Sequence, residues 1–334
     1  MTARPVTLAD VAREAGTSAS TASRALSGRG YVAPDVRKRL LEVADKLGYV
    51  PNLSARTLKQ RTSRVVGVIV SDLSNQFYAA LAAGIEQALR EADYQMLLLG
   101  DNSEAAEELA GARTFLSMRA PGVIMTPASG STAELLSSRG VPVVEVDRRL
   151  AANSCDAVVI DNERGAREAV SHLLELGHTR IALLVARTTW TTDAGRLEGY
   201  RSALAEAGVR VDRRLVLKIE THDAAAASRI DTLVQTEKPT AIFAANNVLA
   251  EQAWRVLRRR DLEIPSDVSL VAFDDVPWME MVQPPITAVR QPAYEMGRRA
   301  ALLLLRRLDD ATAGRTVEVL QPELVVRGST AAKS

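Results

Sequence analysis

Small polar side chains and one arginine follow one another between residues 18 and 24, and together they could read the edges of nucleic-acid bases. Hydroxyl groups donate and accept hydrogen bonds at base edges and phosphates, and Arg24 can form two parallel bonds to a guanine. On a helix these side chains would share an outer face small enough for the major groove. The predicted outward set is Ala19, Ser20, Thr21, Ser23 and Arg24.

Two short helices with a glycine turn between them are predicted to position this set. Thr7 can cap the first helix, with Asp10 completing a capping-box-like pair, and Gly16 supplies the turn. Ser18 can cap the second helix. The inward-facing residues are expected to be Leu8, Val11, Ala12, Ala15, Ala22, Ala25 and Leu26. This arrangement is typical of a helix-turn-helix.

A third helix and a short linker are predicted to follow. Apolar residues recur at helical spacing over residues 34–47, and Pro34 suits a first helical turn. After Pro51, Asn52 can cap a helix of about two turns, which is too short to be stable alone. Leu58 lies among basic residues and leaves two interpretations open. It is either a wedge inserted into a base step from the minor groove or an apolar contact with the rest of the chain.

The net charge of +1 conceals an asymmetry along the 334 residues. Residues 1–64 carry 12 Lys and Arg against 5 Asp and Glu, a net charge of +7, whereas the remainder carries −6. A basic head on an acidic body indicates a polyanionic partner for the head alone. The single cysteine, Cys155, excludes an intrachain disulfide, and no stretch is typical of a membrane span or a signal peptide. We therefore expect a cytoplasmic protein.

Beyond residue 64, short apolar strands alternate with helices, which predicts two doubly wound parallel sheets. The predicted strands are 65–70, 95–99, 122–125, 143–146, 157–160, 180–185, 216–219, 241–244 and 269–273. The predicted helices are 77–92, 105–117, 163–176, 196–207, 225–236, 248–259 and one that starts near residue 294. In such sheets ligands bind at the carboxyl ends of the strands, so a cleft between the two halves is the expected site.

Polar and aromatic side chains just past the strand ends are the candidates for this cleft. Carboxylates accept hydroxyl protons, an arginine donates in a fork, and an indole covers the apolar face of a sugar ring, so the set suits a polyol. The candidates are Asp72, Asn75, Phe77, Tyr78, Asp147, Trp190, Thr192, Arg196, His222, Asn246 and Asp274. Other roles stay open: Asp72 and Asp274 as turn or helix caps, Arg196 in a structural ion pair, and Trp190 and His222 packed away from any ligand.

Several segments in the right order resemble one family. Leu-Gly-Tyr-Val-Pro-Asn at 47–52, Ala-Arg-Thr-Leu at 55–58 and Val-Val-Gly-Val-Ile-Val-Ser-Asp-Leu-Ser-Asn at 65–75 look like the LacI/GalR family of bacterial transcription regulators. The resemblance runs from Val6 to Thr330. It implies a homodimer on a near-palindromic operator, with paired hinge helices in the minor groove, and a body of two periplasmic-binding-protein-like lobes around one small ligand.

The same resemblance implies domain bounds. The helix-turn-helix head would span 1–50, the hinge 51–63 and the effector-binding and dimerisation body 64–334. Within the body, the N-lobe would comprise about 64–161 and 291–322, and the C-lobe about 162–290 and 323–334.

Site residues also follow from the resemblance. Ala19, Ser20 and Arg24 take base-reading positions, Leu58 is the paired wedge, and Arg196 clamps the effector. Asn246 and Asp274 match other polar effector contacts, and Phe77, Trp190 and Thr192 match pocket-lining positions. The complete expected DNA-contact set is Thr7, Ser18, Ala19, Ser20, Thr21, Ser23, Arg24, Arg29, Asn52, Ala55, Arg56, Leu58 and Lys59.

Two positions depart from the family pattern. Ala19 is smaller than the side chains that many members carry, so one base contact would be apolar. Asn247 stands where many members have an aspartate, so a carboxylate is lost there.

The expected function is a DNA-binding transcriptional repressor whose operator affinity is switched by a sugar-like ligand. We predict no cofactor and no metal, because His172, His178 and His222 lack metal-ligand spacing. The chain shows no nucleophile elbow, Cys-x-x-Cys or P-loop, so an enzyme is not expected. The alternatives are a solute-binding protein, or a glycoside hydrolase built on the candidate carboxylates. No leucine heptad follows the body, which favours a dimer.

Overall fold

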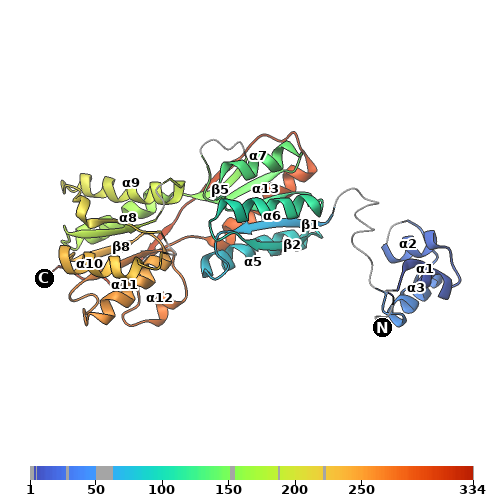
Figure 1. Ribbon diagram of the computed structural model, residues 1–334, viewed down its shortest axis with the longest axis horizontal. Coiled ribbons are helices and arrows are strands. Elements are labelled where there is room, and N and C mark those ends of the chain that lie inside the picture. The colour runs from blue at the N-terminus through green and yellow to red at the C-terminus, as the bar shows by residue number, and fades with distance from the viewer. Residues whose placement is uncertain are drawn as a thin grey trace. The chain divides into compact units, whose positions relative to one another are not determined.

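The computed structural model describes residues 4, 6–27, 30–49, 63–150, 155–186, 189–220 and 223–333. The chain divides into two compact units, Met1–Ser63 and Arg64–Ser334, which are called the head and the body below (Figure 1). Among the described residues, no helix has the length and the apolar composition that crossing a membrane requires.

In the described part of the head, the helices are α1 (Leu8–Glu14), α2 (Ala19–Ser27) and α3 (Pro34–Lys46). The predicted capping box is confirmed, because the Asp10 backbone N–H donates to Thr7 Oγ1 at 3.3 Å and the Thr7 N–H donates to Asp10 Oδ2 at 3.0 Å. Gly16 has a φ of +65°, as the turn requires. The buried core is Val11, Ala12, Ala15, Ala22, Ala25, Leu40 and Ala44.

Six strands form each of two sheets in the body, and we call the half built on each sheet the N-lobe and the C-lobe. The N-lobe sheet has the order β11-β5-β4-β3-β1-β2, and the C-lobe sheet β12-β10-β9-β8-β6-β7. Only β12 pairs antiparallel. In the N-lobe the strands are β1 (Val65–Val70), β2 (Gln95–Gly100), β3 (Val123–Met125), β4 (Val143–Asp147), β5 (Asp156–Ile160) and β11 (Val317–Leu320). In the C-lobe they are β6 (Ile181–Val185), β7 (Val216–Lys218), β8 (Ala241–Ala244), β9 (Ser269–Phe273), β10 (Thr287–Arg290) and β12 (Glu323–Val325).

Helices cover both faces of each sheet, as parallel sheets require (Figure 1). In the N-lobe they are α5 (Gln76–Glu91), α6 (Ala105–Ser117), α7 (Gly130–Ser138) and α13 (Ala293–Asp309). In the C-lobe they are α8 (Asn162–Glu175), α9 (Thr191–Glu206), α10 (Ala226–Glu237), α11 (Asn247–Arg259) and α12 (Trp278–Met281), with a 3₁₀ turn, Arg213–Leu215. Helices α5 and α13 approach closely through Gly84 and Gly297, where a Cβ would meet backbone oxygens at 1.9 and 2.0 Å.

Each of the nine predicted strands overlaps one of the strands β1–β9, and every predicted body helix is present. Three short strands, β10, β11 and β12, and two helices, α7 and α12, were not predicted. Helix α9 begins at Thr191, five residues before the predicted start at 196. Its first turn, Thr-Thr-Asp, has low helix propensity, but burial of Thr192 and Asp193 overrides that preference.

The chain crosses between the lobes three times, after β5, after β10 and between β11 and β12. At the first crossing, Asp161 caps α8 by accepting from the Arg164 N–H, and its own N–H donates to Leu320 O at 3.0 Å. The first and third crossings are therefore hydrogen-bonded to each other.

Candidate functional site

A pocket of about 580 Å³, its open mouth included, lies between the lobes at the carboxyl ends of β1, β4, β6, β9 and β10. Ten of the eleven predicted cleft residues line it, and the eleventh, His222, lies outside the described residues. The complete lining is Ser71, Asp72, Asn75, Phe77, Tyr78, Ser103, Asp147, Arg148, Trp190, Thr192, Asp193, Arg196, Asn246, Val248, Asp274 and Gln291.

Six lining residues were not among the eleven candidates, although two of them, Arg148 and Asp193, lie in strand-end segments that the sequence singles out for the cleft. Arg148 and Asp193 adjoin candidate residues, and Ser71 directly follows β1, so their positions at strand ends were a usable signal. Gln291 follows β10, a strand that was not predicted. Ser103 lies three residues past the end of β2, so the same signal was present there, whereas Val248 is apolar and lies in α11.

Asp147 is a deeply buried acceptor in the N-lobe wall, with 6% of its surface exposed. The Tyr78 hydroxyl donates to its Oδ2 at 3.3 Å. Burial raises the pKa of Asp147 to about 6, although Arg148 and Arg196 lower it. Burial also raises the pKa of Tyr78 above its ordinary value. The pair can therefore offer one acceptor and one hydroxyl to a ligand.

Arg196 is held from several sides in the C-lobe wall. Its Nε donates to Asn162 Oδ1 at 2.9 Å, and its Nη1 donates to Ala245 O at 2.6 Å. Its Nη2 lies 3.7 Å from Asp274 Oδ1, and its guanidinium carbon lies 3.8 Å from the centroid of the Phe273 ring. The ion pair left open by the sequence is thus present, and the same side chain lines the pocket.

Several candidate residues also have local structural roles. Asp72 Oδ1 accepts from the N–H and the hydroxyl of Ser74, so it closes a turn. Asn75 caps α5 by accepting from the Phe77 N–H, and Asn246 caps α11 by accepting from the Leu249 N–H. Capping uses only the side-chain oxygen of each asparagine, so capping itself leaves their NH₂ groups as donors.

Asp274 is fixed by donors from both neighbouring segments. The Asn247 N–H donates to its Oδ2 at 3.3 Å, and Gln291 Nε2 donates to its Oδ1. Because Asn247 is the first residue of α11, Asp274 receives a donor from a helix N-terminus as well as the nearby charge of Arg196.

Direct contacts between described residues join the lobes around the pocket. Asn75 and Asn247 exchange two amide hydrogen bonds, with N···O distances of 2.7 and 3.2 Å. The Arg149 N–H donates to Thr191 Oγ1 at 3.1 Å. The Arg148 guanidinium carbon lies 3.6 Å from the centroid of the Trp190 indole. The indole face that was expected to cover a sugar ring therefore carries a guanidinium.

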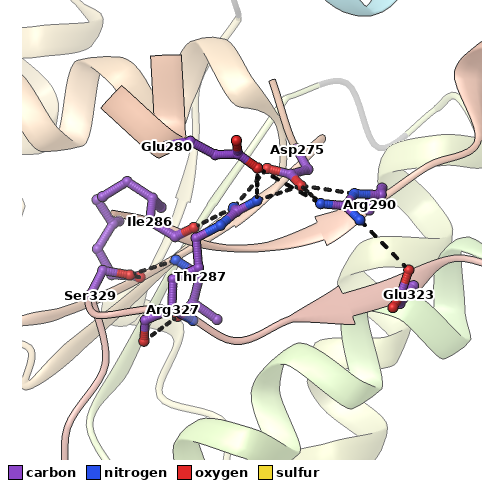
Figure 2. A network of polar contacts seen from close by, with 9 residues as sticks. Asp275, Glu280, Ile286, Thr287, Arg290, Glu323, Arg327 and Ser329 are labelled. Atoms are coloured by element: carbon purple, nitrogen blue, oxygen red, sulfur yellow. Dashed lines mark hydrogen bonds and ion pairs between the residues drawn. The ribbon is translucent and has the colours of Figure 1, made fainter. Parts of the chain in front are cut away.

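Behind the pocket, the segments that carry Asp274 and Gln291 are tied together by a network of charges (Figure 2). Asp275 receives two parallel bonds from Arg327, at 2.7 and 2.8 Å, and further bonds from Arg290 at 2.8 and 3.0 Å. The network links β10 to the segment that follows β12, and it fixes the ends of two strands that present pocket side chains.

A buried acid pair lies beside the N-lobe wall. Asp101 is 1% exposed; its Oδ1 accepts from the Ser103 N–H, and its Oδ2 has no partner among the described residues. Burial raises the pKa of Asp101 to about 7. Glu108 is fully buried and accepts from the Ala128 and Ser129 backbones, so it braces the loop before α7.

Neither the histidines nor the cysteine form a reactive centre in the part of the chain that the structure describes. No group of three or more His, Cys, Asp or Glu residues there could hold a metal ion. His172 bonds Thr330 Oγ1 at 2.9 Å, and His178 lies within 3.0 Å of Thr240 Oγ1 and Ala331 O. Burial raises the pKa of the Cys155 thiol to about 11, which keeps it protonated and unreactive.

The outer face of α2 is polar and open, as the sequence predicted. Ala19, Ser20 and Arg24 are exposed, and Thr21 and Ser23 are half-buried. Ser18 Oγ accepts from the Thr21 N–H at 3.1 Å, which is the predicted cap. The remaining expected DNA contacts, apart from Thr7, lie outside the described residues; they are Arg29, Asn52, Ala55, Arg56, Leu58 and Lys59.

Tyr31 is an exposed aromatic residue of the head that was not among the predicted DNA contacts. Its side chain is 85% exposed in the segment between α2 and α3. An exposed tyrosine beside a polar helix can bond a phosphate, and its place directly after the glycine-rich turn was the available signal.

Two family descriptions match the chain. Residues 7–52 match the bacterial regulatory proteins of the lacI family, and residues 170–330 match a periplasmic binding protein-like domain. The HTH-type transcriptional regulator DegA of Bacillus subtilis (strain 168) is 33% identical over 97% of this chain and 98% of its own length. Catabolite control protein A of Priestia megaterium is 34% identical over 97% and 99%.

Solved structures show the same architecture. The complex of the transcriptional regulator CelR with cellobiose is 31% identical, covers 98% of this chain and 100% of its own, and has a TM-score of 0.74. The lac repressor dimer bound to operator and the anti-inducer ONPF is 25% identical, with the same coverage and a TM-score of 0.85.

Proposed function

Because the chain belongs to the lacI family of bacterial regulatory proteins, we propose that a ligand bound between the lobes controls the affinity of the head for operator DNA. The protein is a DNA-binding transcription regulator and not an enzyme. The observation that carries the proposal is the pocket itself, because polar side chains from both lobes converge on it and the lobes touch around it.

The head binds DNA through the open face of α2. Ala19, Ser20 and Arg24 read bases in the major groove, while Thr7 and Ser18 contact the backbone near the helix starts. The hinge side chains Asn52, Ala55, Arg56, Leu58 and Lys59 bind the minor groove, with Leu58 as the wedge. Arg29 adds a phosphate contact. The assembly is a homodimer on a near-palindromic operator in the cytoplasm, and the similarity to the lac repressor dimer bound to operator supports this arrangement.

The effector is a neutral sugar. Carboxylates outnumber arginines in the pocket lining, where Asp72, Asp147, Asp193 and Asp274 stand against Arg148 and Arg196. Hydroxyl groups donate well to such carboxylates, whereas a phosphate would meet an excess of negative charge. The complex of the relative CelR with cellobiose and the similarity to a ribose operon repressor support a sugar.

The regulator acts as a repressor, and ligand binding changes operator affinity through the angle between the lobes. A coupling free energy of about 1–3 kcal/mol would alter DNA affinity roughly 5- to 150-fold. Induced release of DNA is the direction we propose.

Fluorescence anisotropy tests the DNA arm. Labelled fragments of the promoter of the protein's own gene are titrated with the dimer at fixed salt, and a scrambled fragment serves as the control. Preferential binding of the promoter supports the proposal, and equal binding of both fragments contradicts it.

A thermal-shift comparison tests the effector arm. Cellobiose, ribose and glucose are compared with glucose 6-phosphate and inorganic phosphate, because a ligand of the folded state raises the melting temperature. We expect the shift from a neutral sugar. Stabilisation by the phosphorylated compounds alone would contradict a neutral effector while leaving the DNA arm intact.

A further inference from the structure

Arg148 is a buried cation with few polar partners among the described residues. It is 2% exposed and follows β4 in the N-lobe. Its Nη2 donates to Ser71 Oγ, and its Nε has no hydrogen-bond partner among the described residues. Within those residues, no carboxylate oxygen lies within the 4.0 Å that would define an ion pair with it. A buried guanidinium with a free donor loses hydration without full compensation.

Besides the bond to Ser71 in its own lobe, Arg148 is stabilised by a contact from the other lobe. Its guanidinium carbon lies 3.6 Å from the centroid of the Trp190 ring, and Trp190 precedes α9 in the C-lobe. A desolvated arginine over an indole face is strongly attracted to it. Since the partners belong to different lobes, the attraction acts directly on the separation between the lobes.

The backbone at Arg148 supports this role. Asp147 has a φ of +71°, and the Arg148 N–H donates to Val146 O at 2.9 Å, which is the geometry of a classic γ-turn. This turn is strained, and strained backbone conformations persist mainly at functional sites, where they fix the direction of a side chain. It ends β4 abruptly and directs the chain so that Asp147 and Arg148 both line the pocket.

Stacking uses only the face of the guanidinium. Its N–H groups lie in the plane of the group, so the edge remains available while the face rests on the indole. Arg148 lines the pocket, and its buried Nε has no acceptor among the described residues, so the stack on the indole is a main stabilising contact of this guanidinium.

We propose that Arg148 and Trp190 form a clasp between the lobes that sets how far the pocket closes. This inference rests on the proposed function, because lobe closure matters only if it is coupled to DNA. Weakening the clasp shifts the lobes without touching the DNA-binding face, and so it changes operator affinity when no effector is present.

A double-mutant cycle tests the clasp without any ligand. The proteins are wild type, Arg148→Ala, Trp190→Ala and the double variant, with Arg149→Ala as the matched control. Each single variant should lower the melting temperature by about 2–4 °C, and the double variant should lower it little further, because both remove one contact. Fully additive shifts would overturn the proposal.

Quenching by acrylamide provides a second readout. The signal of Trp190 is obtained as the difference between each protein and its Trp190→Phe counterpart, which removes the contributions of Trp254 and Trp278. Arg148→Ala should increase quenching of Trp190 severalfold, and Arg149→Ala should leave it unchanged. Unchanged quenching in Arg148→Ala would overturn the proposal. If that variant does not fold, Arg148→Lys keeps the charge but lacks the planar face.

The third readout separates the clasp from a merely structural role. Arg148→Lys should change the affinity for the promoter fragment severalfold in the absence of sugar, whereas Arg149→Ala should not. If wild type does not prefer the promoter fragment, the proposed function is wrong. The double-mutant cycle and the quenching still test whether Arg148 and Trp190 form the clasp, because neither uses DNA. If wild type binds selectively and both variants match it, the clasp fails and the function stands.

Discussion

Asp147 and Asp274 occupy equivalent places in the two lobes. Asp147 ends β4, which lies between β5 and β3, and Asp274 follows β9, which lies between β10 and β8. Both have left-handed backbones, with φ values of +71° and +70°. Aspartate tolerates this conformation better than most residues. Each wall of the pocket therefore contains an aspartate with a left-handed backbone at the carboxyl end of a central strand.

This duplication has an electrostatic consequence. Burial raises the pKa of Asp147, and the neighbouring Asp274 carboxylate adds to the increase. Arg196 lies beside Asp274 and lowers the pKa of Asp147, so it relieves the repulsion between the two walls.

Replacing Arg196 by alanine should abolish the ligand response and retain operator binding. The variant removes the arginine donors of Asn162 Oδ1 and Ala245 O, the positive charge beside Asp274 and part of the pocket wall. The measurement is promoter anisotropy with and without a sugar that stabilises wild type, and the response should fall from about 5-fold or more to none. Arg201→Ala, on the exposed side of α9, is the control. An unaltered response in Arg196→Ala would place the effector elsewhere.

Replacing Leu58 by alanine should weaken specific DNA binding more than non-specific binding. A wedge in a base step acts only on the bent operator, whereas phosphate contacts act on any duplex. Binding to promoter and scrambled fragments is measured across a salt series. Equal losses on both fragments would favour the alternative, in which Leu58 packs on the body.

Replacing Asn247 by aspartate should weaken the contact between the lobes. The reciprocal amide pair with Asn75 loses one hydrogen bond, and a new carboxylate arises beside Asp274, which already bonds the backbone of residue 247. The melting temperature should fall at pH 8, and Asn75→Asp/Asn247→Asp should fall further because no amide donor remains. A double variant as stable as wild type would show that the pair contributes nothing.

Replacing Asp101 by asparagine should stabilise the protein at high pH. Burial raises the pKa of Asp101 from 3.8 to about 7, so the folded state holds its proton at pH values where the unfolded chain has released it. Its contribution to stability is complete below about pH 4 and is lost as the pH rises through 7. The melting temperatures of wild type and Asp101→Asn are measured from pH 5 to 8. The variant should become increasingly more stable than wild type as the pH rises. A constant difference in melting temperature across this pH range would contradict the raised pKa of Asp101.

Replacing Arg327 by methionine should destabilise the C-lobe. Asp275 is 5% exposed and would lose its bidentate partner. Breaking such a buried pair costs roughly 3–5 kcal/mol, and the remaining bonds from Arg290 favour the lower end. Urea unfolding measures the loss. Arg255→Met, in the exposed pair with Glu251, should change stability by less than about 0.5 kcal/mol. An equal loss of stability in the two variants would show that the Asp275 network does not stabilise the C-lobe.

The helices and strands that were predicted from the sequence are those with a strong local pattern of apolar or helix-capping residues. The strands β1–β9 are apolar runs, and Thr7, Asp10 and Ser18 mark the helix starts by side-chain chemistry, so these elements were recognised. Strand β11 alternates exposed and half-buried residues at a sheet edge, and α7 begins with Gly-Ser-Thr, so neither has a pattern of its own. Tertiary pairing decides both.

The site shows the same division. Polar residues just past apolar strands identified most of the pocket, because parallel strands bring their carboxyl ends together. Gln291 was missed along with its strand. The stacking of Arg148 on Trp190 joins residues from two lobes, and sequence carries no signal for which groups meet across that gap.

The three passages of the chain between the lobes determine the order in which the body can be completed during synthesis. A nascent chain that has emerged through residue 160 already contains five of the six strands of the first sheet. The helix α13 that covers one face of that sheet is translated only after the whole second lobe except β12, and β11 and β12 follow it. One face of the N-lobe sheet therefore stays uncovered until residues 293–334 have been synthesised, and such an exposed apolar surface favours aggregation unless a chaperone binds it.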